Sequence, residues 1–424
     1  MARIILATFG SLGDLHPYIA IALGLKARGH QPVVATIAMY RERIETQGIE
    51  FHPVRPDLPL PDQALMRRVM DARRGGEVVF KEFVLPYLRV GYEDLSAAVR
   101  GADLLISHVI TLAAPLIGRK LGKPWVSTVL SPLSMFSASD PPVWPAMPAR
   151  ERFARMGRFL NRGFMRFADW VTRSWFKDYR QLEHELGLPA GPSPMFEGQH
   201  SPYRILALFS AALAPPQDDW PSQTRVTGFP FFDRDERGST PTELEGLLAD
   251  GPPPVVFTLG SSAVHDARDF FTESIAAVRM LGCRAVLITG RETGNELPKP
   301  LPPGIAAFDY LPFSEIFPRA AAIVHQGGIG TTGQAMRSGR PMLVMPYSHD
   351  QPDNAARLKR LGVARTISRE RYNARSASAE LDRLLHDPAY AMKAAGIGER
   401  VRAEDGVRAA CDEIEAFVHA PVEK

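Results

Sequence analysis

Short apolar runs alternate with amphipathic stretches along most of this chain, and this alternation constrains its fold more than any other feature. It is the pattern of parallel strands covered by helices. Two proline-rich breaks, at residues 131–148 and 214–254, interrupt it. The runs that read as strands lie at residues 3–9, 32–36, 103–108 and 125–129, and then at 255–259, 284–288, 306–308, 321–325 and 342–345. We therefore expect an α/β fold with two Rossmann-like domains, each built on a doubly wound parallel sheet.

The length of 424 residues also favours two domains, because single hydrophobic cores stop growing at about 250–300 residues. We expect an N-terminal domain at residues 1–226, an interdomain linker at 227–251, a C-terminal domain at 252–398 and a final helix at 399–424. Ligands in such sheets bind beyond the carboxyl ends of the strands. Two domains that face each other therefore enclose one central cleft.

The most distinctive turn follows the apolar run at 321–325, where a histidine is followed by glycines and then by a helix-like stretch. Glycines let the backbone approach an anion closely, and the first turn of a helix offers unpaired N–H groups and a positive dipole end. Two threonine hydroxyls and the histidine add donors. The residues concerned are His325, Gly327, Gly328, Gly330, Thr331 and Thr332. This turn predicts a cradle for a phosphorylated ligand.

The same turn also matches the dinucleotide fingerprint G-x-G-x-x-G at residues 328–333. Asp350 and Asp353 follow close to the offset of about 20 residues at which a ribose-binding carboxylate is expected. A histidine before the glycines is not part of that fingerprint, and the first domain has a polar turn of its own at residues 10–14. An NAD-dependent dehydrogenase stays open as an alternative.

Several other classes of function find no support in composition and spacing. The formal net charge of +3 gives no overall electrostatic basis for nucleic-acid binding. Two cysteines cannot form a disulfide framework, the first apolar run is too short for a secretory signal, and no stretch is long enough to span a membrane, so we expect a cytoplasmic protein. No His/Cys cluster has zinc spacing, and the Asp233-Arg234-Asp235 run reads as a solvated part of the linker. No metal site is expected.

Three segments together carry a resemblance to a known family. They are residues 8–17, residues 214–230 between the domains, and residues 325–355, which include the His325 turn. On these segments the chain resembles the nucleotide-sugar glycosyltransferases of the two-domain GT-B fold. The middle segment is similar to that of bacterial sterol-glucosyltransferase-like and rhamnolipid rhamnosyltransferase-like members. The resemblance spans nearly the whole chain and implies that the final helix crosses back to the first domain.

The resemblance implies an inverting, metal-independent transfer of a hexose, of glucose or rhamnose type, from a UDP- or dTDP-sugar to a hydroxyl of a hydrophobic acceptor. A carboxylate or imidazole takes the acceptor proton while that oxygen attacks the anomeric carbon, and the diphosphate leaves from the opposite face. The His325 turn would then stabilise the leaving diphosphate. The nucleotide sugar is a substrate, so no resident cofactor is expected. A nucleotide-sugar epimerase of the same fold is a further alternative.

The family motif places the catalytic base directly after the glycine of the first loop, and this position is Asp14 here. His16 is the alternative base. Relatives often carry an aspartate at the end of the strand at 103–108, where this chain has His108. In this interpretation the two residue types are exchanged, and His108 supports Asp14. The competing interpretation is that Asp14 only caps the helix expected to begin at residue 17.

The resemblance also assigns residues to the donor. Asp350 and Gln351 fall where the family holds the sugar hydroxyls, although Asp350 also suits the N-cap of the helix that follows. Tyr310 and Leu311 match the segment that carries the nucleobase platform, and Gln334 stands near the place of a ribose-binding glutamate. The turn residues expected near the donor phosphates are Gly13, Ser261 and Ser262.

Apolar residues at the first proline-rich break, and arginines interleaved with aromatic residues from residue 150 onward, indicate the acceptor side. Such a helix can line a pocket for a lipid-like acceptor, and its arginines can meet an anionic membrane surface. The alternative is a helix that packs on its own domain and has a solvated basic face. The residues expected to contact the acceptor are Met135, Phe136, Phe153 and Phe159.

Overall fold

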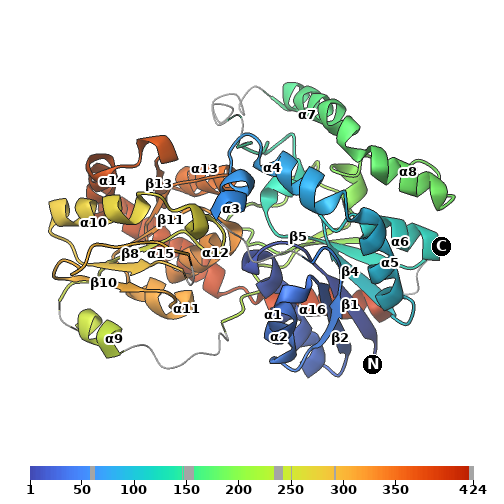
Figure 1. Cartoon of the computed structure of the whole chain (residues 1–424), viewed down its shortest axis with the longest axis horizontal. Coiled ribbons are helices and arrows are strands. Elements are labelled where there is room, and N and C mark those ends of the chain that lie inside the picture. The colour runs from blue at the N-terminus through green and yellow to red at the C-terminus, as the bar shows by residue number, and fades with distance from the viewer. Residues whose placement is uncertain are drawn as a thin grey trace.

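The structure, a computed structural model, has two α/β domains that lie side by side (Figure 1). It describes residues 1–57, 63–145, 147, 157–233, 242–249, 251–290 and 293–419. Each domain holds one sheet, and the strand pairs in both sheets are parallel. The predicted architecture of two doubly wound parallel sheets is therefore confirmed.

The N-terminal sheet has seven strands in the order β3-β2-β1-β4-β5-β6-β7. The order reverses at β1, which pairs with both β2 and β4. The carboxyl ends of β1 and β4 therefore flank the crevice where such sheets bind ligands. The strands are β1 (Arg3–Ala7), β2 (Gln31–Thr36), β3 (Glu50–Pro53), β4 (Leu104–His108), β5 (Trp125–Val129), β6 (Arg204–Ala207) and β7 (Thr224–Val226).

The C-terminal sheet has six strands in the order β10-β9-β8-β11-β12-β13. Its order reverses at β8, which pairs with both β9 and β11. The strands are β8 (Val255–Thr258), β9 (Ala285–Ile288), β10 (Ile305–Phe308), β11 (Ala322–His325), β12 (Met342–Val344) and β13 (Ala364–Thr366).

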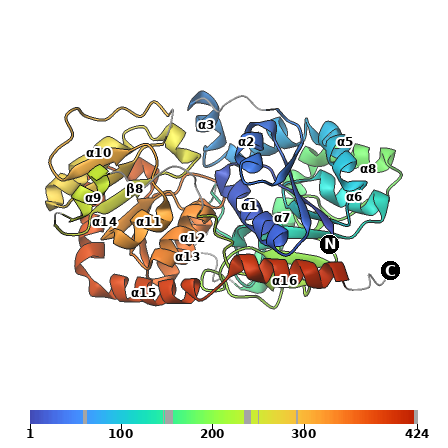
Figure 2. The ribbon, with the colours of Figure 1, turned by 90° about the horizontal axis from the view of Figure 1, so that it is seen from below.

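Helices cover both faces of each sheet (Figures 1 and 2). Those before the linker are α1 (Leu12–Ala27), α2 (Arg41–Glu45), α3 (Gln63–Val69), α4 (Gly75–Val78), the π-helical η2 (Val79–Val84), α5 (Leu88–Val99), α6 (Ala113–Leu121), the short 3-10 helix η3 (Pro132–Met135), α7 (Arg158–Thr172), α8 (Lys177–Glu185) and the short 3-10 helix η7 (Glu197–Gln199). Helix α9 (Thr242–Ala249) lies within the expected linker. The α-helices after it are α10 (Phe270–Leu281), α11 (Phe313–Ile316), α12 (Ile329–Ser338), α13 (Gln351–Leu361), α14 (Ala374–His386), α15 (Pro388–Arg402) and α16 (Gly406–His419).

Helix α1 begins at Leu12, five residues earlier than the start expected at Pro17. Ser11 is its N-cap, and the Ser11 hydroxyl accepts the backbone N–H of Gly13 at 3.2 Å. Pro17 lies inside the helix. The preference of proline for the first helical turn set the expected start too late, because a capping box starts this helix upstream of the proline.

Helix α16 returns to the N-terminal domain, where it lies along α1 (Figure 2). Arg28, just after α1, pairs with Asp412 and with Glu415 at 2.6 Å each. Gly24 lets the helices approach closely, since a Cβ there would lie 2.8 Å from Sγ of Cys411. The last helix therefore packs on the N-terminal domain and links it to the C-terminal domain.

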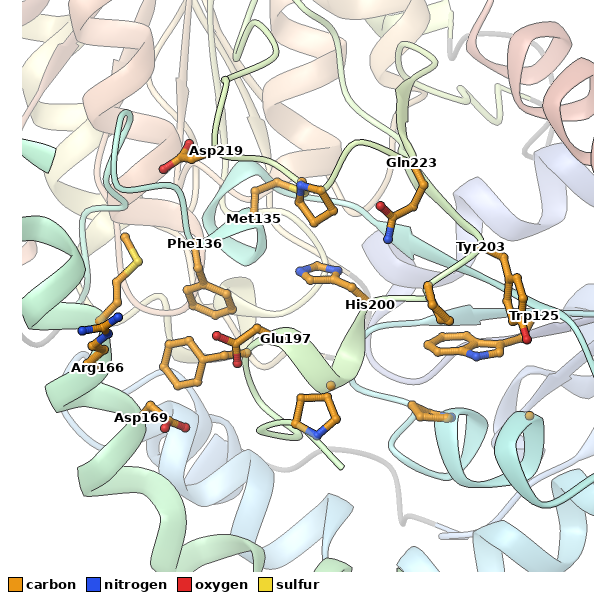
Figure 3. Close-up of a pocket in the computed structure, with 18 of the residues that line it drawn as sticks. Trp125, Met135, Phe136, Arg166, Asp169, Glu197, His200, Tyr203, Asp219 and Gln223 are labelled. Atoms are coloured by element: carbon orange, nitrogen blue, oxygen red, sulfur yellow. The ribbon is translucent and has the colours of Figure 1, made fainter. Parts of the chain in front are cut away.

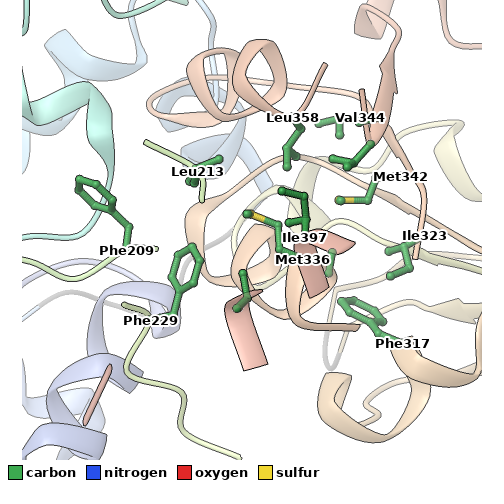
Figure 4. Close-up of a cluster of buried hydrophobic side chains, with 14 of the residues drawn as sticks. Phe209, Leu213, Phe229, Phe317, Ile323, Met336, Met342, Val344, Leu358 and Ile397 are labelled. Atoms are coloured by element: carbon green, nitrogen blue, oxygen red, sulfur yellow. The ribbon is translucent and has the colours of Figure 1, made fainter. Parts of the chain in front are cut away.

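One cluster of buried side chains runs from the N-terminal domain through the linker into the C-terminal domain (Figure 4). Phe209 follows β6, Phe229 lies in the linker, and Met336 belongs to α12. Phe229 packs on α12 at Gly333, where a Cβ would lie 3.0 Å from the Phe229 ring. Because burial of apolar surface contributes about 25 cal/mol per Å², this shared cluster holds the domains in one arrangement.

Candidate active site

The two switch points face each other where the domains meet. The first turn of α1 lies against the first turn of α12, because a Cβ on Gly330 would lie 3.7 Å from Cα of Gly13. Ile329, at the start of α12, packs on buried clusters of both domains. The structure therefore brings together the two glycine turns that the sequence singled out.

Asp14 occupies the third position of α1 and completes a capping box. Its Oδ2 accepts the backbone N–H of Ser11 at 2.7 Å and the Ser11 hydroxyl at 3.1 Å. Gly10 makes room for this carboxylate, since a Cβ there would overlap Oδ2. Among the described residues no hydrogen bond reaches Oδ1 of Asp14. Asp14 thus caps the helix through one of its two carboxylate oxygens.

His108 ends β4 and lies in the electric field of Asp14. Burial lowers the pKa of His108, whereas the charge of Asp14 and a hydrogen bond with the backbone of Phe9 raise it. Nδ1 of His108 is buried and has no hydrogen-bond partner among the described residues. The structure therefore couples His108 to Asp14 by charge and not by a direct hydrogen bond.

His16 turns toward the linker. Its ring packs on Phe232, with 5.3 Å between the ring centroids. The ring is thus engaged in the contact between α1 and the linker, two residues away from Asp14.

His325 ends β11 and is fully buried. Its Nδ1 accepts the backbone N–H of Gly327 at 3.0 Å, which places the proton of a neutral ring on Nε2. Burial lowers the pKa of His325 to about 3, so the ring is neutral at physiological pH. Nε2 is buried without a partner in the described part of the chain. A neutral N–H donor is therefore fixed at the end of β11.

The threonines of the turn differ in their contacts. The hydroxyl of Thr331 accepts a long hydrogen bond, at 3.4 Å, from the amide of Gln326. The hydroxyl of Thr332 is fully buried, and none of the described residues bonds to it. Gly260, at the end of β8, has a φ of +65° and leaves no space for a Cβ beside the Gln326 amide. The β8 turn and the His325 turn therefore pack tightly, with exposed Ser261 and half-buried Ser262 next to them.

Asp350 directly precedes α13, but its side chain does not cap that helix and instead contacts the first residue of α12. Its Oδ2 accepts the backbone N–H of Ile329 at 3.0 Å and the side-chain amide of Asn354 at 2.7 Å. Burial raises the pKa of Asp350 to about 7, with the Asn354 hydrogen bond opposing the rise and the charge of Asp14 adding to it. The carboxyl group is therefore half-ionised near neutral pH.

Asn354 is a site residue that the sequence interpretation did not assign. Its amide also donates to the backbone oxygen of Gly327 at 2.9 Å, and its Oδ1 accepts the Ser131 hydroxyl at 3.4 Å from the other domain. The available signal was an amide one helical turn after Asp350 at the start of α13. Gln351 is buried, and its Oε1 accepts the backbone N–H of Tyr347 at 2.8 Å.

The remaining donor-side residues lie in different surroundings. Leu311 is a buried core residue, and Tyr310 is half-buried beside it. Gln334 faces the linker, where its amide donates to Asp233 at 3.0 Å and its oxygen accepts from Arg337 at 2.8 Å. Asp233, expected to be solvated, is paired with Arg337 at 2.7 Å, and Asp235 lies outside the described residues. Within the described ranges no group of three or more His, Cys, Asp or Glu side chains can hold a metal ion.

Met135 and Phe136 line a cavity of about 660 Å³ under α7 in the N-terminal domain (Figure 3). The ring of Phe136 packs on Phe196 with 4.6 Å between centroids. Phe159, also expected at the acceptor, is 87 % exposed on α7. Phe153 lies outside the described residues.

A smaller pocket, of about 50 Å³, lies at the carboxyl ends of β1 and β4, and its lining does not include Asp14 itself. Thr8 forms part of its wall and donates through its hydroxyl to the backbone oxygen of Asp14 at 3.3 Å. Phe83, Tyr87 and Ile110 give it an apolar lining. The sequence interpretation did not single out these residues. The apolar stretch just before α5, which includes Phe83 and Tyr87, could have indicated them.

Two sets of contacts close the domains on each other. Arg357, almost fully buried in α13, pairs with Asp353 of its own helix at 2.8 Å and with Asp140 of the other domain. Asp353 in turn accepts the backbone N–H of Val143 at 2.9 Å. A second contact joins Ser348 to the backbone oxygen of Asp71 at 2.9 Å.

The sequence matches two family models. Residues 4–115 match the glycosyltransferase family 28 N-terminal domain, and residues 277–416 match the erythromycin biosynthesis protein CIII-like C-terminal domain. O-mycaminosyltylonolide 6-deoxyallosyltransferase of Streptomyces fradiae is 33% identical over 430 residues, which cover 98% of this chain and 97% of that enzyme. Sterol 3-beta-glucosyltransferase of Neosartorya fischeri is 30% identical over 97% of this chain, which spans only 29% of that longer enzyme.

Solved glycosyltransferase structures share the whole fold. The glycosyltransferase of kitacinnamycin superposes with a TM-score of 0.73 at 23% identity and covers 98% of this chain and 99% of its own. The calicheamicin glycosyltransferase CalG4 gives a TM-score of 0.72 at 16% identity, over 99% of this chain and 100% of its own. The glycosyltransferase VinC, in complex with DTDP, gives 0.65 at 19% identity, over 99% of this chain and 100% of its own.

Proposed function

This chain belongs to the nucleotide-sugar glycosyltransferases of the GT-B fold, and on that basis we propose that it transfers a hexose from a UDP- or dTDP-sugar to a hydroxyl of a hydrophobic acceptor. The proposed transfer inverts the anomeric carbon and needs no metal ion. One observation carries the proposal: the buried Nε2–H of His325 has no partner among the described residues and lies on the turn that opens α12. The dehydrogenase and epimerase alternatives find no support among the relatives described above.

The donor diphosphate would lie at the first turn of α12. There the backbone N–H groups of Gly330 and Thr331 have no partner within the helix, and the hydroxyl of Thr332 is unpaired in the described part of the chain. Together with His325 they present donors to the charge that develops on the leaving group. Gly327, Gly328, Ser261 and Ser262 surround the same place. DTDP in the VinC complex supports a dTDP-sugar as the donor, with a UDP-sugar as the alternative.

Asp14 would act as the base through Oδ1. The turn that holds it lies against Gly330, so an acceptor hydroxyl beside Asp14 would also lie beside the donor. Transfer of the hydroxyl proton to Oδ1 accompanies attack of the oxygen on the anomeric carbon, and the bond to the diphosphate breaks. His108 would support Asp14 through its coupling to the charge of the carboxylate, before the proton is transferred. His16 is less suited to this role because its ring packs on Phe232.

The sugar and the nucleoside would be held further along the C-terminal domain. Oδ1 of Asp350 would accept a hydrogen bond from a sugar hydroxyl, while Oδ2 accepts the backbone N–H of Ile329. The side-chain amide nitrogen of Gln351 would donate to a sugar hydroxyl, since its oxygen accepts the backbone N–H of Tyr347. Tyr310 would flank the nucleobase, with Leu311 packed behind it in the core. Gln334 would reach the ribose only after leaving Asp233 and Arg337.

The reacting end of the acceptor would enter the apolar pocket lined by Phe83, Tyr87 and Ile110. At about 50 Å³ this pocket holds only a small group, so the acceptor would displace side chains as it binds. Met135 and Phe136 line the larger cavity instead, and their contact with the acceptor stays a prediction.

Contact with an anionic membrane surface is also proposed, through α7. Asn161 anchors this helix to the domain by donating to the backbone oxygen of Ala138 at 3.0 Å. Phe159, Phe167 and Trp170 recur at helical spacing and are 87 %, 57 % and 65 % exposed, which is unusual for a protein surface. Exposed arginines, at positions 158, 162, 166 and 173, flank this apolar face. Basic and aromatic residues arranged in this way fit the interface of an anionic bilayer.

No helix in the described ranges is long and apolar enough to cross a membrane, so the proposed contact is peripheral.

A nucleotide screen tests the donor class. We expect UDP or dTDP, and their sugar conjugates, to raise the melting temperature of the protein, and NADH to leave it unchanged. Proton NMR of the glycoside formed from an α-linked donor should show the β-anomer. Stabilisation by NADH alone would overturn the proposal, and an α-linked product would overturn inversion.

A further inference from the structure

The cavity under α7 has the size and lining of a ligand site. Its volume of about 660 Å³ lies within the range of roughly 300–1,000 Å³ that small-molecule pockets occupy. Trp125 and Tyr203 line one end, and Phe136 and Phe196 line the centre (Figure 3). None of the facing turns around Asp14 and His325 contributes to its wall. It is therefore separate from the proposed transfer site.

Two half-buried charges in the wall of this cavity, Arg119 and Asp219, are already paired or hydrogen-bonded. Arg119 pairs with Glu183, which is itself buried among hydrogen bonds. Asp219 accepts the Ser137 hydroxyl at 2.6 Å and the backbone N–H of Ala138 at 2.7 Å. These groups have no need of a charged ligand. Three other full charges of the lining, on Arg162, Arg166 and Glu197, lie on exposed side chains that water solvates, so the inner wall favours a neutral ligand.

Two buried polar atoms of the lining have no partner among the described residues, and both are acceptors. They are Nδ1 of His200 and Oδ1 of Asp169. The ring of His200 hydrogen-bonds to the backbone of Ser134, which fixes its proton on the other nitrogen. Burial lowers the pKa of His200 to about 4, so Nδ1 carries a lone pair at neutral pH. An unpaired buried acceptor is costly unless a ligand supplies a donor.

We propose that this cavity is a second ligand site, which takes a neutral hydrophobic molecule that carries hydroxyl groups. The aromatic rings would pack on the apolar body of the ligand, and one ligand hydroxyl would donate to Nδ1 of His200. Figure 3 shows His200 between Phe136 and the Trp125 end, within reach of a ligand that spans the cavity. A second hydroxyl would donate to Oδ1 of Asp169 on α7. Binding of this ligand requires neither the donor sugar nor the transfer reaction.

A matched pair of probes tests this site. We would measure binding of the rigid hydrophobic diol 17β-estradiol and of its dimethyl ether by titration calorimetry. The wild-type protein should bind the diol roughly 3- to 10-fold more tightly than the ether, because the ether cannot donate a hydrogen bond. In His200→Phe this preference should fall to the part contributed by Asp169. Far-UV circular dichroism and the melting temperature would show whether the variant is folded.

A second variant keeps the test valid if His200→Phe fails to fold. Glu197 is exposed on the rim of the cavity, and Glu197→Trp should block entry and abolish binding of both probes. The same titrations in Ile110→Trp, which would fill the pocket proposed for the acceptor, distinguish this cavity from the transfer site, because binding in the cavity should be unchanged there. The proposal is overturned if Glu197→Trp binds as the wild type does, or if the preference for the diol is equal in His200→Phe. Neither readout needs a donor or turnover, so a failure of the proposed transfer would leave both interpretable.

Discussion

Asp350 and Ile329 are joined across the start of α12 by a hydrogen bond of 3.0 Å, from the backbone N–H of Ile329 to Oδ2 of Asp350. The protein thus places a carboxyl group of its own where the helix offers donors to an anion. Because burial raises the pKa of Asp350 to about 7, the charge of this group changes near physiological pH. Below that pH the neutral carboxyl tolerates a diphosphate, and above it the carboxylate repels one.

The affinity for UDP or dTDP should therefore fall as pH rises from 6 to 8. A bound anion raises the pKa of Asp350 further, and the affinity lost is about tenfold for each unit of that shift. In Asp350→Asn the amide oxygen can still accept from Ile329, and the loss should disappear. Calorimetric titration of both proteins from pH 6 to 8 measures this loss. The difference between the two proteins excludes the contribution from ionisation of the nucleotide itself, which is the same in both. An equal pH dependence in the two proteins would contradict the assignment.

Asp14→Asn should lower kcat by about 10²- to 10⁴-fold, because the amide cannot take the acceptor proton. Its oxygen can still accept from Ser11, so the melting temperature should change little. Ser11→Ala is the matched control: it removes the N-cap, costs about 1 kcal/mol of stability, and leaves the carboxylate of Asp14 in place. Steady-state kinetics at saturating donor measures kcat for the two variants and the wild type. Similar kcat values for Asp14→Asn and the wild type would remove Asp14 as the base.

His325→Gln should lower kcat by about 10²- to 10³-fold, the usual effect of losing one donor to a developing negative charge. Because burial lowers the pKa of His325 to about 3, the wild-type ring is neutral throughout the working range. The variant should therefore have the same pH profile at a lower rate. His108→Gln offers the contrast, since a group coupled to the charge of Asp14 should change the profile. A new inflection between pH 5 and 9 in His325→Gln would contradict a neutral donor role.

The elements of the fold were predictable because a buried parallel strand needs a continuous apolar run. The runs that became β1, β8 and β11 end within one or two residues of the expected positions. Strands β3, β6, β7 and β13 were missed. Of these, β3, β7 and β13 are edge strands that are only partly buried, so they have no continuous apolar run.

The turns of the candidate site were predictable, but their hydrogen bonds were not. A glycine turn at a strand end is a local property of the sequence, so the His325 turn was found from its residues alone. Whether Gln334 faces a ligand or Asp233 depends on a pairing between residues 101 positions apart. The same holds for Asn354, whose oxygen meets Ser131 of the other domain. Such contacts follow from packing of the two domains and leave no local pattern.

Arg357→Met should destabilise the protein by about 3–5 kcal/mol, because it leaves Asp353 buried without its cation. Asp140 also loses its partner, so the contact between the domains weakens. Chemical denaturation followed by circular dichroism would measure the loss. Arg360→Met is the control, since Arg360 contacts the same Asp140 at 3.0 Å from a more exposed position and should cost less than about 1 kcal/mol. Equal effects of the two substitutions would argue against a buried clamp at Arg357.

The membrane contact proposed for α7 predicts a loss of vesicle binding when its arginines are neutralised. Each arginine near an anionic surface contributes about 1 kcal/mol, so replacing three of them by glutamine should weaken binding by about 100-fold. The residues to replace are Arg158, Arg162 and Arg166. Trp170→Ser should weaken binding on its own, because the exposed indole would enter the interface. Sedimentation with vesicles of phosphatidylglycerol and phosphatidylcholine measures both.

A control variant tests whether the position of the arginines matters for vesicle binding, or only the net charge of the protein. Arg371, Arg375 and Arg383 are exposed on the C-terminal domain, and replacing them by glutamine removes the same charge from a different surface. That variant should bind vesicles as the wild type does at equal ionic strength. Binding should also vanish on vesicles of phosphatidylcholine alone, since these carry no anionic lipid. If both triple variants lose binding equally, the attraction reflects net charge. If neither does, and Trp170→Ser instead changes the oligomeric state, α7 faces another protein chain.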